Sequence, residues 1–155
     1  MPKRTLDSLD ELKQLVGQEV AVTDWFTMTQ DRIQQFADAT LDHQWIHVDV
    51  ERAKRESPFK APIAHGFLTL SLLAHFMQQA VAVKQGVRMG VNYGMNKVRF
   101  VSPVRVGSNM RARFVLQSLK DVEGNGIEAQ YYATIETEGS DKPACVAEWL
   151  VRYYR

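Results

Sequence analysis

The sequence predicts an α+β fold in which an antiparallel sheet curves around one long apolar helix. Residues 61–83 contain no Asp, Glu, Lys or Arg, and a helix that is apolar on nearly all sides must be buried by its surroundings. From residue 97 onward, apolar and polar residues alternate in four segments, which is typical of half-buried strands. A sheet that covers the helix buries both apolar surfaces at once.

The N-terminal third contains the shorter elements. Ser8 and Glu11 have the spacing of a capping box, which predicts a short amphipathic helix that stops at Gly17. The other elements expected in this part are a strand at residues 19–24, a helix capped by Thr29 that fades near Thr40, a loop at residues 41–50 and one helical turn at residues 51–56.

The remaining elements are the long helix and the strands. The helix is expected from Gly66 to Lys84, after prolines at positions 58 and 62 that break structure. Turn residues at 123–126 and 138–143 predict hairpins, so the strands around them are neighbours and antiparallel. The expected strands are residues 97–101, 109–119, 127–137 and 145–154. Such a sheet has edges that need covering, and dimerisation is one way to cover them.

Length and charge narrow the class of protein. A chain of 155 residues and 17.7 kDa fits one domain, which we expect to span residues 1–155. Nineteen Lys and Arg against 18 Asp and Glu give a net charge of +1, without the clustered basic surface that nucleic-acid binding needs. Nucleic acid is therefore not an expected partner.

The sequence also argues against a membrane or secreted protein. The uncharged stretch is long enough to span a bilayer, but it contains Pro62, His65 and His75, whose polar groups are costly in lipid. Met1-Pro2-Lys3-Arg4 is followed by polar residues, so no signal peptide is visible and we expect a cytoplasmic protein. The single cysteine, Cys145, lies in an apolar run and is interpreted as a buried small residue.

The strongest candidate for chemistry is the segment around Asp42 and His47. These residues are five apart, so a continuous helix would separate them by about 140° around its axis, whereas an irregular loop lets them converge on one water. Histidine titrates near neutral pH, and a carboxylate can orient or share its proton. The pair is thus suited to proton transfer.

Two other interpretations of the same segment stay open. In the structural one, Asp42 caps a turn and His47 is a buried, hydrogen-bonded histidine. In the other, Asp42, His43, His47 and Asp49 supply metal ligands, although no familiar metal-binding spacing is present. The absence of a familiar spacing disfavours a metal.

A second candidate feature is Pro62-Ile63-Ala64-His65-Gly66-Phe67, at the start of the apolar helix. Free backbone N–H groups at a helix start favour an anion or a developing oxyanion. Gly66 allows a ligand to approach the backbone closely, although it also suits a simple loop-to-helix turn. An N–H donor beside the Asp–His pair makes a site for chemistry next to a thioester or ester carbonyl.

The sequence contains Asp42-x4-His47-x-Asp49, followed by the segment 62–67. This pair of motifs resembles the signature of the MaoC-like dehydratases, which include the (R)-specific enoyl-CoA hydratases of the hotdog superfamily. The later stretch of residues 92–100 is also similar to that family. The resemblance covers roughly residues 15–155 and implies a hotdog fold, usually dimeric. The implied partners are an acyl-CoA thioester substrate and a second copy of the chain.

The resemblance implies reversible addition of water to trans-2-enoyl-CoA, which gives (R)-3-hydroxyacyl-CoA. It also implies that neither a metal nor another cofactor is needed. Asp42 and His47 would hold the water and exchange its protons, and the Gly66 N–H would bind the thioester oxygen. The alternatives are an acyl-CoA thioesterase on the same fold and a non-catalytic acyl-CoA-binding subunit. Residues implied to lie near the substrate are His65, Phe67, Ala74 and Asn96, with Lys97 and Arg99 as candidates for the CoA phosphates.

Overall fold

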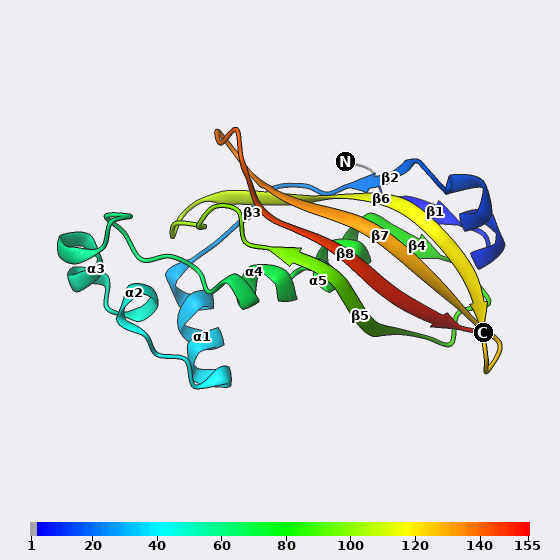
Figure 1. Cartoon of the computed structure of the whole chain (residues 1–155), viewed down its shortest axis with the longest axis horizontal. Helices are drawn as coiled ribbons and strands as arrows, with labels where there is room; N and C mark the ends of the chain where they lie inside the picture. The colour runs from blue at the N-terminus through cyan, green and yellow to red at the C-terminus, as the bar shows by residue number, and fades with distance from the viewer. Residues whose placement is uncertain (1–2) are drawn as a thin grey trace.

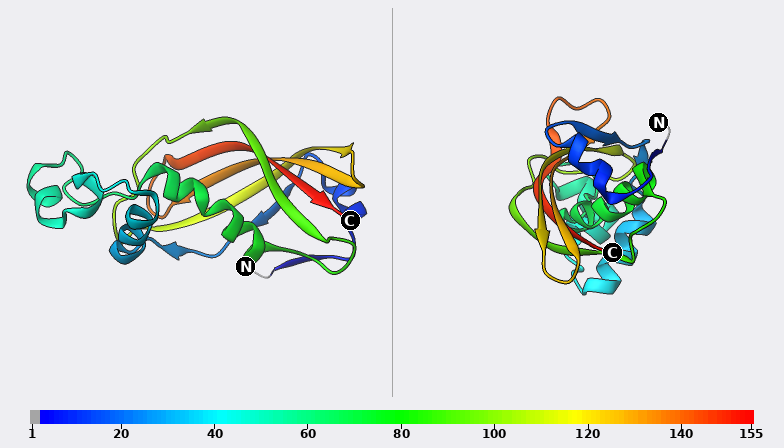
Figure 2. Two further views of the ribbon diagram at one scale, coloured as in Figure 1. Left: turned by 90° about the horizontal axis from the view of Figure 1, so that it is seen from below. Right: turned by 90° about the vertical axis from the view of Figure 1, so that its right-hand side faces the viewer.

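The computed structural model describes residues 3–155 as a curved antiparallel sheet wrapped around a central helix (Figure 1). Met1 and Pro2, the first residues of the expected domain and of the segment considered for a signal peptide, lie outside the described residues. The predicted α+β architecture is confirmed. The end-on view in Figure 2 shows the helix lying within the curve of the sheet.

The main sheet has the strand order β2-β6-β7-β8-β5, and β3 also pairs with β6. Both expected hairpins are present, because β6 pairs with β7 and β7 with β8 in antiparallel register. The strands of this sheet are β2 (Glu19–Val22), β3 (Phe26–Thr27), β5 (Met89–Arg99), β6 (Asn109–Val122), β7 (Gly126–Thr137) and β8 (Pro143–Tyr154).

The core lies between the inner face of this sheet and the central helix. Alternate residues of β6, β7 and β8 point inward, as the period-two pattern predicts. From the helix, Leu73 and Phe76 are buried against them. Phe114, Tyr131 and Trp149 form a cluster of ring contacts on the sheet side. Burying this apolar surface is the main driving force that holds helix and sheet together.

The central helix is shorter than predicted. It consists of α4 (Gly66–Ser71) and α5 (Leu73–Ala80), joined at Leu72, and it ends at Ala80 rather than at Lys84. The following Val81–Val83 form β4, which pairs in parallel with β1 (Arg4–Leu6). The β-branched valines suit a strand, and β1, far away in sequence, supplies the backbone partners that end the helix.

Three expectations in the first third of the chain need correction. Leu9–Leu15 form a 3₁₀ helix (η1), and Ser8 makes no side-chain capping bond there. β2 ends at Val22, because the Thr23 hydroxyl accepts the hydrogen bond of the Ala112 N–H at 2.9 Å in place of a backbone carbonyl. The predicted loop at residues 41–50 contains the short helix α2 (Trp45–Val48).

The edge strand β5 is the largest departure among the strands. The alternating pattern predicts a strand at residues 97–101, but β5 begins at Met89 and ends at Arg99. Most of β5 is exposed, and its pairing with β8 is interrupted by two register shifts. An exposed, irregular edge carries little hydrophobic alternation, so pairing with β8 defines this strand rather than its own sequence pattern.

The helices α1 (Gln30–Thr40), α2 and α3 (Val50–Glu56) gather at one end of the molecule, beyond the sheet (Figures 1 and 2). The predicted cap of α1 is confirmed, since the Thr29 hydroxyl accepts the Arg32 N–H at 3.2 Å. Among residues 3–155, no helix is long and apolar enough to cross a membrane. This cluster of helices meets the start of α4, which is where the candidate site lies.

Candidate active site

Asp42 lies in a short turn between α1 and α2. The preceding Leu41 adopts the left-handed conformation (φ 67°), which ends α1 and reverses the chain. One carboxylate oxygen of Asp42 accepts the backbone N–H of Gln44 at 3.3 Å, an Asx-type turn that leads into α2. The second oxygen has no partner among residues 3–155. The side chain therefore caps its turn and keeps one acceptor available.

His47 is buried in α2 with one ring nitrogen already engaged. Its Nδ1 donates to the Ile63 carbonyl at 2.6 Å, since a carbonyl oxygen can only accept. In the neutral ring Nε2 is then the atom with the free lone pair. Burial lowers the pKa of His47, and the nearby His65 adds to this shift, while the hydrogen bond to the Ile63 carbonyl and the charge of Asp42 oppose it without reversing it. His47 is thus held neutral near pH 7, with Nε2 ready to accept a proton.

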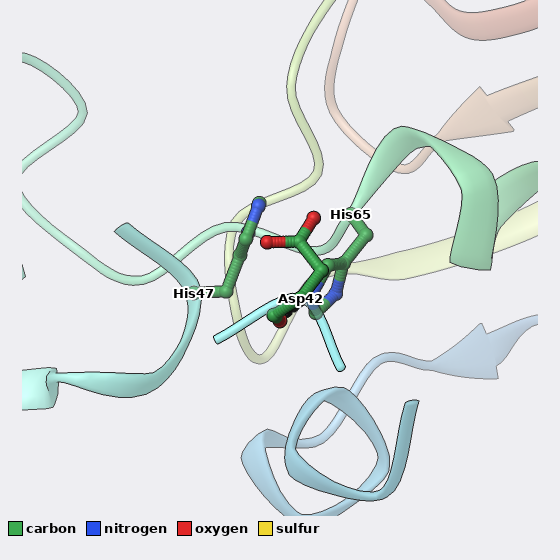
Figure 3. A group of neighbouring side chains, drawn as sticks. All are labelled: Asp42, His47 and His65. Atoms are coloured by element: carbon green, nitrogen blue, oxygen red, sulfur yellow. Dashed lines mark hydrogen bonds between the residues drawn. The ribbon is translucent and has the colours of Figure 1, made fainter. Parts of the chain in front are cut away.

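His65, just before α4, brings these two residues together. Its Nε2 donates to the main-chain carbonyl of Asp42 at 3.0 Å, and its ring stacks on the ring of His47 with centroids 3.8 Å apart. Figure 3 shows the carboxylate of Asp42 beside the two rings. One potential ligand atom from each of the three residues lies within 4.8 Å of the others. The loop has therefore allowed Asp42 and His47 to converge, as their spacing predicts.

The same cluster is a poor metal site. The His47 and His65 rings are nearly parallel, with an interplanar angle of 24°, so their in-plane lone pairs cannot both point at one ion placed between them. The other two ligands that the sequence offered also have other roles. His43 binds Asp38 at 2.9 Å, and Asp49 caps α3 by accepting the Arg52 N–H at 3.1 Å. The geometry suits proton transfer better than metal binding.

Gly66 is the first residue of α4, so its N–H has no acceptor in a preceding helical turn. It lines a cavity of about 250 Å³ together with His47. A Cβ at position 66 would lie 3.1 Å from the ring of Phe100, so the site has little room for a larger residue. The other polar side chains at this cavity are Thr69 and Ser102. Cavity, histidine and helix start therefore meet at one place.

Other predicted residues lie elsewhere. Phe67 is 68% exposed and makes an edge contact with Phe100. Ala74 lines two further cavities of about 120 and 190 Å³. Lys97 and Arg99 line a hollow of about 210 Å³ beside Tyr132 and Glu148, on the sheet face away from the helix. Asn96 is exposed on β5. Their contacts with substrate stay predictions, because none of them lines the cavity of His47 and Gly66.

Two expected structural roles are confirmed, and two residues at the site were missed. Cys145 is buried, which raises the pKa of its thiol to about 11. Ser71 lies inside the apolar helix, where a serine is expected to bond back to the carbonyl four residues earlier, and its hydroxyl donates to the Phe67 carbonyl at 2.6 Å. The orienting role of the Ile63 carbonyl and the position of Thr69 in the cavity wall were not predicted from the sequence. Thr69 follows Gly66 by three residues, so helical spacing alone puts it on the same side of α4.

Comparison with known proteins supports the sequence resemblance. A profile described as the MaoC-like domain matches residues 11–138. The chain is 51% identical over 150 residues, covering 97% of this chain and 98% of the relative, to 3-hydroxyacyl-thioester dehydratase Z of Mycobacterium tuberculosis. It is 46% identical over 143 residues, covering 92% and 89%, to nodulation protein N of Rhizobium meliloti.

A solved structure agrees with the fold. The (R)-hydratase from A. caviae involved in PHA biosynthesis superposes with a TM-score of 0.70 at 24% identity, over 88% of this chain and 94% of that one. At this identity the likeness concerns the hotdog fold. The profile match extends over most of the chain, and the first relative is similar over almost its whole length. The chain therefore belongs to the MaoC-like domain family.

Proposed function

We propose that the protein is a hydro-lyase that interconverts trans-2-enoyl-CoA and (R)-3-hydroxyacyl-CoA. The observation that carries the proposal is the convergence of Asp42 on His47, a residue that lines the same cavity as Gly66. The similarity to a protein named 3-hydroxyacyl-thioester dehydratase supports the same reaction class. A site with an acid–base pair beside a backbone donor matches what addition of water to an activated alkene requires.

In the hydration direction, one water is held between the Asp42 carboxylate and His47 Nε2. The pair takes a proton from the water as its oxygen forms a bond to C3. The π electrons between C2 and C3 move toward the thioester carbonyl, and a proton held by the pair is then delivered to C2. One proton is removed from the water and one proton is returned to C2, so the reaction balances without a cofactor. Dehydration follows the same path in reverse, and the two residues act as one coupled unit.

The Gly66 N–H stabilises the negative charge that develops on the thioester oxygen. This N–H stands at the start of α4 and at the same cavity as His47. A donor of this kind is typically worth about 3 kcal/mol in the transition state. The thioester carbonyl is accordingly placed against Gly66, with C2 and C3 toward Asp42 and His47.

The remaining predicted contacts concern the ends of the substrate. The acyl chain would extend toward Ala74, whose cavities lie between α5 and the inner side of β5 and β8. Lys97 and Arg99 are exposed cationic residues at the C-terminal end of β5. They line one surface hollow, and they would bind the CoA phosphates. Phe67 and Asn96 would contact substrate near the entrance.

We further propose that the protein acts as a homodimer joined along β5. This strand forms one edge of the main sheet and is 11 residues long. Its Met89, Val91 and Tyr93 are 46%, 41% and 56% exposed. A long edge strand with exposed apolar side chains is a favourable surface for pairing with another chain.

The experiment that tests the catalytic pair compares matched variants. We expect Asp42→Asn and His47→Gln each to lower kcat for hydration of trans-2-enoyl-CoA by at least about 100-fold, the usual contribution of general acid–base catalysis. Asp49→Asn and His43→Gln are the controls, since they change the same residue types at exposed positions of the same segment. The controls should keep kcat within about threefold.

Retention of activity in Asp42→Asn or His47→Gln would overturn the assignment of the pair. Release of free thiol, with no 3-hydroxyacyl-CoA formed, would instead support the thioesterase alternative, since hydrolysis of the thioester also removes the enoyl-thioester absorbance. Binding of acyl-CoA without any turnover would support a binding subunit. Circular dichroism of each variant distinguishes loss of chemistry from loss of fold.

A further inference from the structure

His65 is buried at the junction of the two catalytic residues, but it is not part of the cavity wall. It is 3% exposed, and the cavity that contains His47 and Gly66 is lined by its neighbours Ala64 and Gly66 rather than by His65 itself. Figure 3 shows the rings of His65 and His47 beside the Asp42 carboxylate, and the two rings are in direct stacking contact. Asp42 does not line this cavity either, but its side chain is exposed, whereas His65 is both buried and absent from the cavity wall, so a role through other residues is better supported for His65 than contact with substrate.

The hydrogen bond of His65 fixes the turn that carries Asp42. Nε2 of His65 donates to the main-chain carbonyl of Asp42 at 3.0 Å, across 23 residues of sequence. Among the described residues, Asp42 is otherwise held only by its own turn, through the Gln44 N–H. Because Asp42 is exposed and follows a residue in the left-handed conformation, this bond is what ties the turn to the start of α4.

The ring of His65 also limits the position of His47. The two rings stack with centroids 3.8 Å apart, and the His65 ring contacts Phe36 of α1 at 4.9 Å. His47 is already held by the bond from Nδ1 to the Ile63 carbonyl. Stacking restricts tilting of the His47 ring about that bond. The hydrogen bond to Ile63 and the stacking on His65 together fix the direction of the Nε2 lone pair.

The remaining nitrogen of His65 shows that ring packing alone does not explain a histidine here. Nδ1 is buried and has no hydrogen-bond partner within residues 3–155. Leaving a buried polar atom unpaired is unfavourable. Phenylalanine would make the same ring contacts without that cost, so the property that only histidine adds is the Nε2–H donor.

We propose that His65 is a positioning residue that holds Asp42 and His47 in their mutual geometry, by its Nε2–H bond to the Asp42 carbonyl and its stacking on His47. The inference rests on the proposed function, because it assumes that Asp42 and His47 are the catalytic pair. It replaces the substrate contact that the family resemblance implies for His65 with an action through the two neighbours. It also explains why a residue outside the cavity belongs to the signature segment 62–67.

Two substitutions separate the hydrogen bond from the ring. His65→Phe keeps an aromatic ring of similar size and removes the donor. His65→Gln removes the ring, but its side-chain amide places an N–H at about the same distance from the backbone as Nε2. We expect kcat for enoyl-CoA hydration to fall about 100-fold in His65→Phe, the cost of displacing a catalytic group by about 1 Å. We expect kcat of His65→Gln to be at least tenfold higher than kcat of His65→Phe.

Substrate affinity should stay nearly constant in the variants in which kcat falls. Because His65 does not line the cavity, KM and the Kd of a saturated acyl-CoA should stay within about threefold of the unsubstituted protein in both variants. Urea unfolding of both variants, measured in parallel, reports any structural damage. His65→Phe is expected to keep its unfolding midpoint, since it keeps the ring contacts and the loss of the hydrogen bond to the Asp42 carbonyl is offset by removal of the unpaired Nδ1.

The inference would be overturned if His65→Phe kept kcat within threefold, or if both variants lost kcat equally. A rise in Kd that matched the fall in kcat would also overturn it, because it would place His65 in contact with substrate. These failures differ from failure of the proposed function itself. Activity retained in Asp42→Asn and His47→Gln would remove the catalytic pair, whatever the His65 variants do.

Discussion

At the scale of single residues, the site depends on which atoms are already engaged. The structural interpretation of the sequence is correct as far as it goes, because Asp42 does cap a turn and His47 is a buried, hydrogen-bonded histidine. Within the described part of the chain, residues 3–155, those same bonds leave one carboxylate oxygen of Asp42 and one ring nitrogen of His47 without hydrogen-bond partners. The structural and catalytic interpretations are therefore compatible, since the hydrogen bonds that fix each side chain also orient its free atom.

The Gly66 donor can be tested with two substitutions that both add a Cβ. Gly66→Ala retains the N–H, whereas Gly66→Pro removes it. Proline is tolerated at the first position of a helix, and the preceding His65 has φ −59° and ψ 137°, a conformation compatible with a following proline. We expect kcat in Gly66→Pro to lie about 100-fold or more below that of Gly66→Ala, as for loss of an oxyanion donor.

Gly66→Ala serves as the control for crowding, since its Cβ would lie 3.1 Å from the Phe100 ring. Phe100 is 45% exposed and has room to move. The double variant Gly66→Ala with Phe100→Leu should recover part of any activity lost in Gly66→Ala. Equal kcat values for the alanine and proline variants would show that the N–H does not contribute.

The pH dependence of the reaction should report His47. Burial lowers the pKa of His47 below its usual 6.5, so the ring stays neutral at pH values where a free histidine begins to protonate. Protonation of Nε2 removes the lone pair that binds the water. We expect kcat/KM for hydration to stay level as pH falls from 8 to 6.5 and to decline only below pH 6.5. An acid limb with its midpoint above 6.5 would contradict this assignment.

The site shows where prediction from sequence ends at the residue scale. Local spacing was enough to place Asp42 and His47 in one irregular segment and Gly66 at a helix start. The stacking of His65 on His47 depends on how two segments 18 residues apart meet in space, which no spacing rule gives. Lys97 and Arg99 illustrate the same limit, because the register shift between Met95 and Val98 changes which face of β5 each side chain occupies.

At the scale of elements, the connection from α1 to α2 is strained at a defined point. Leu41 has φ 67° and is 80% exposed, so it bears the steric cost of the left-handed conformation without any gain from burial. That cost is about 1–2 kcal/mol for a residue with a Cβ. Glycine avoids the clash but loses about 0.5–1 kcal/mol of chain entropy. Leu41→Gly should therefore stabilise the protein by roughly 0.5–1 kcal/mol.

Urea denaturation measures this change, and Leu41→Ala is the matched control. Alanine keeps the Cβ and hence the strain, so its midpoint should not rise. A gain in Leu41→Ala equal to that in Leu41→Gly would attribute the effect to removal of an exposed apolar side chain. No gain in either variant would show that the left-handed residue carries no measurable strain.

The elements themselves were predicted best where a local signal existed. The Thr29 cap, the two hairpins and the inner faces of β6 and β7 follow from spacing and turn residues. The boundary at Ala80 was missed, because β4 exists only through parallel pairing with β1, over 70 residues away in sequence. The start of β5 was missed for a related reason, since its partner β8 lies at the end of the chain.

At the scale of the whole molecule, the architecture explains why the site lies where it does. The sheet and the central helix pack together around the core, and the helices α1–α3 extend beyond one end of them (Figure 1). Asp42 and His47 come from that extension, whereas Gly66 comes from the central helix. The site is therefore assembled between a packed scaffold and a more exposed segment, a common location for catalytic residues.

The proposed dimer gives a prediction at this scale. Light scattering should report a native mass of about twice the 17.7 kDa of one chain. Val91→Lys introduces a charge on the exposed edge strand β5, and charged residues there disfavour strand pairing. This variant should shift the mass toward that of a single chain at micromolar concentration.

Asp141→Lys, in the exposed turn between β7 and β8, is the control for adding a lysine to the surface. It should leave the native mass unchanged. A single-chain mass for the unsubstituted protein would exclude the homodimer. A dimer that Val91→Lys did not weaken would place the interface away from β5.

The most direct test of the account is a hydration assay on the purified protein with trans-2-enoyl-CoA substrates of short and long chain. The account predicts loss of the enoyl-thioester absorbance, a product oxidised only by an (R)-specific 3-hydroxyacyl-CoA dehydrogenase, and no such reaction with Asp42→Asn. An (S) product, or free thiol in place of hydration, would contradict it.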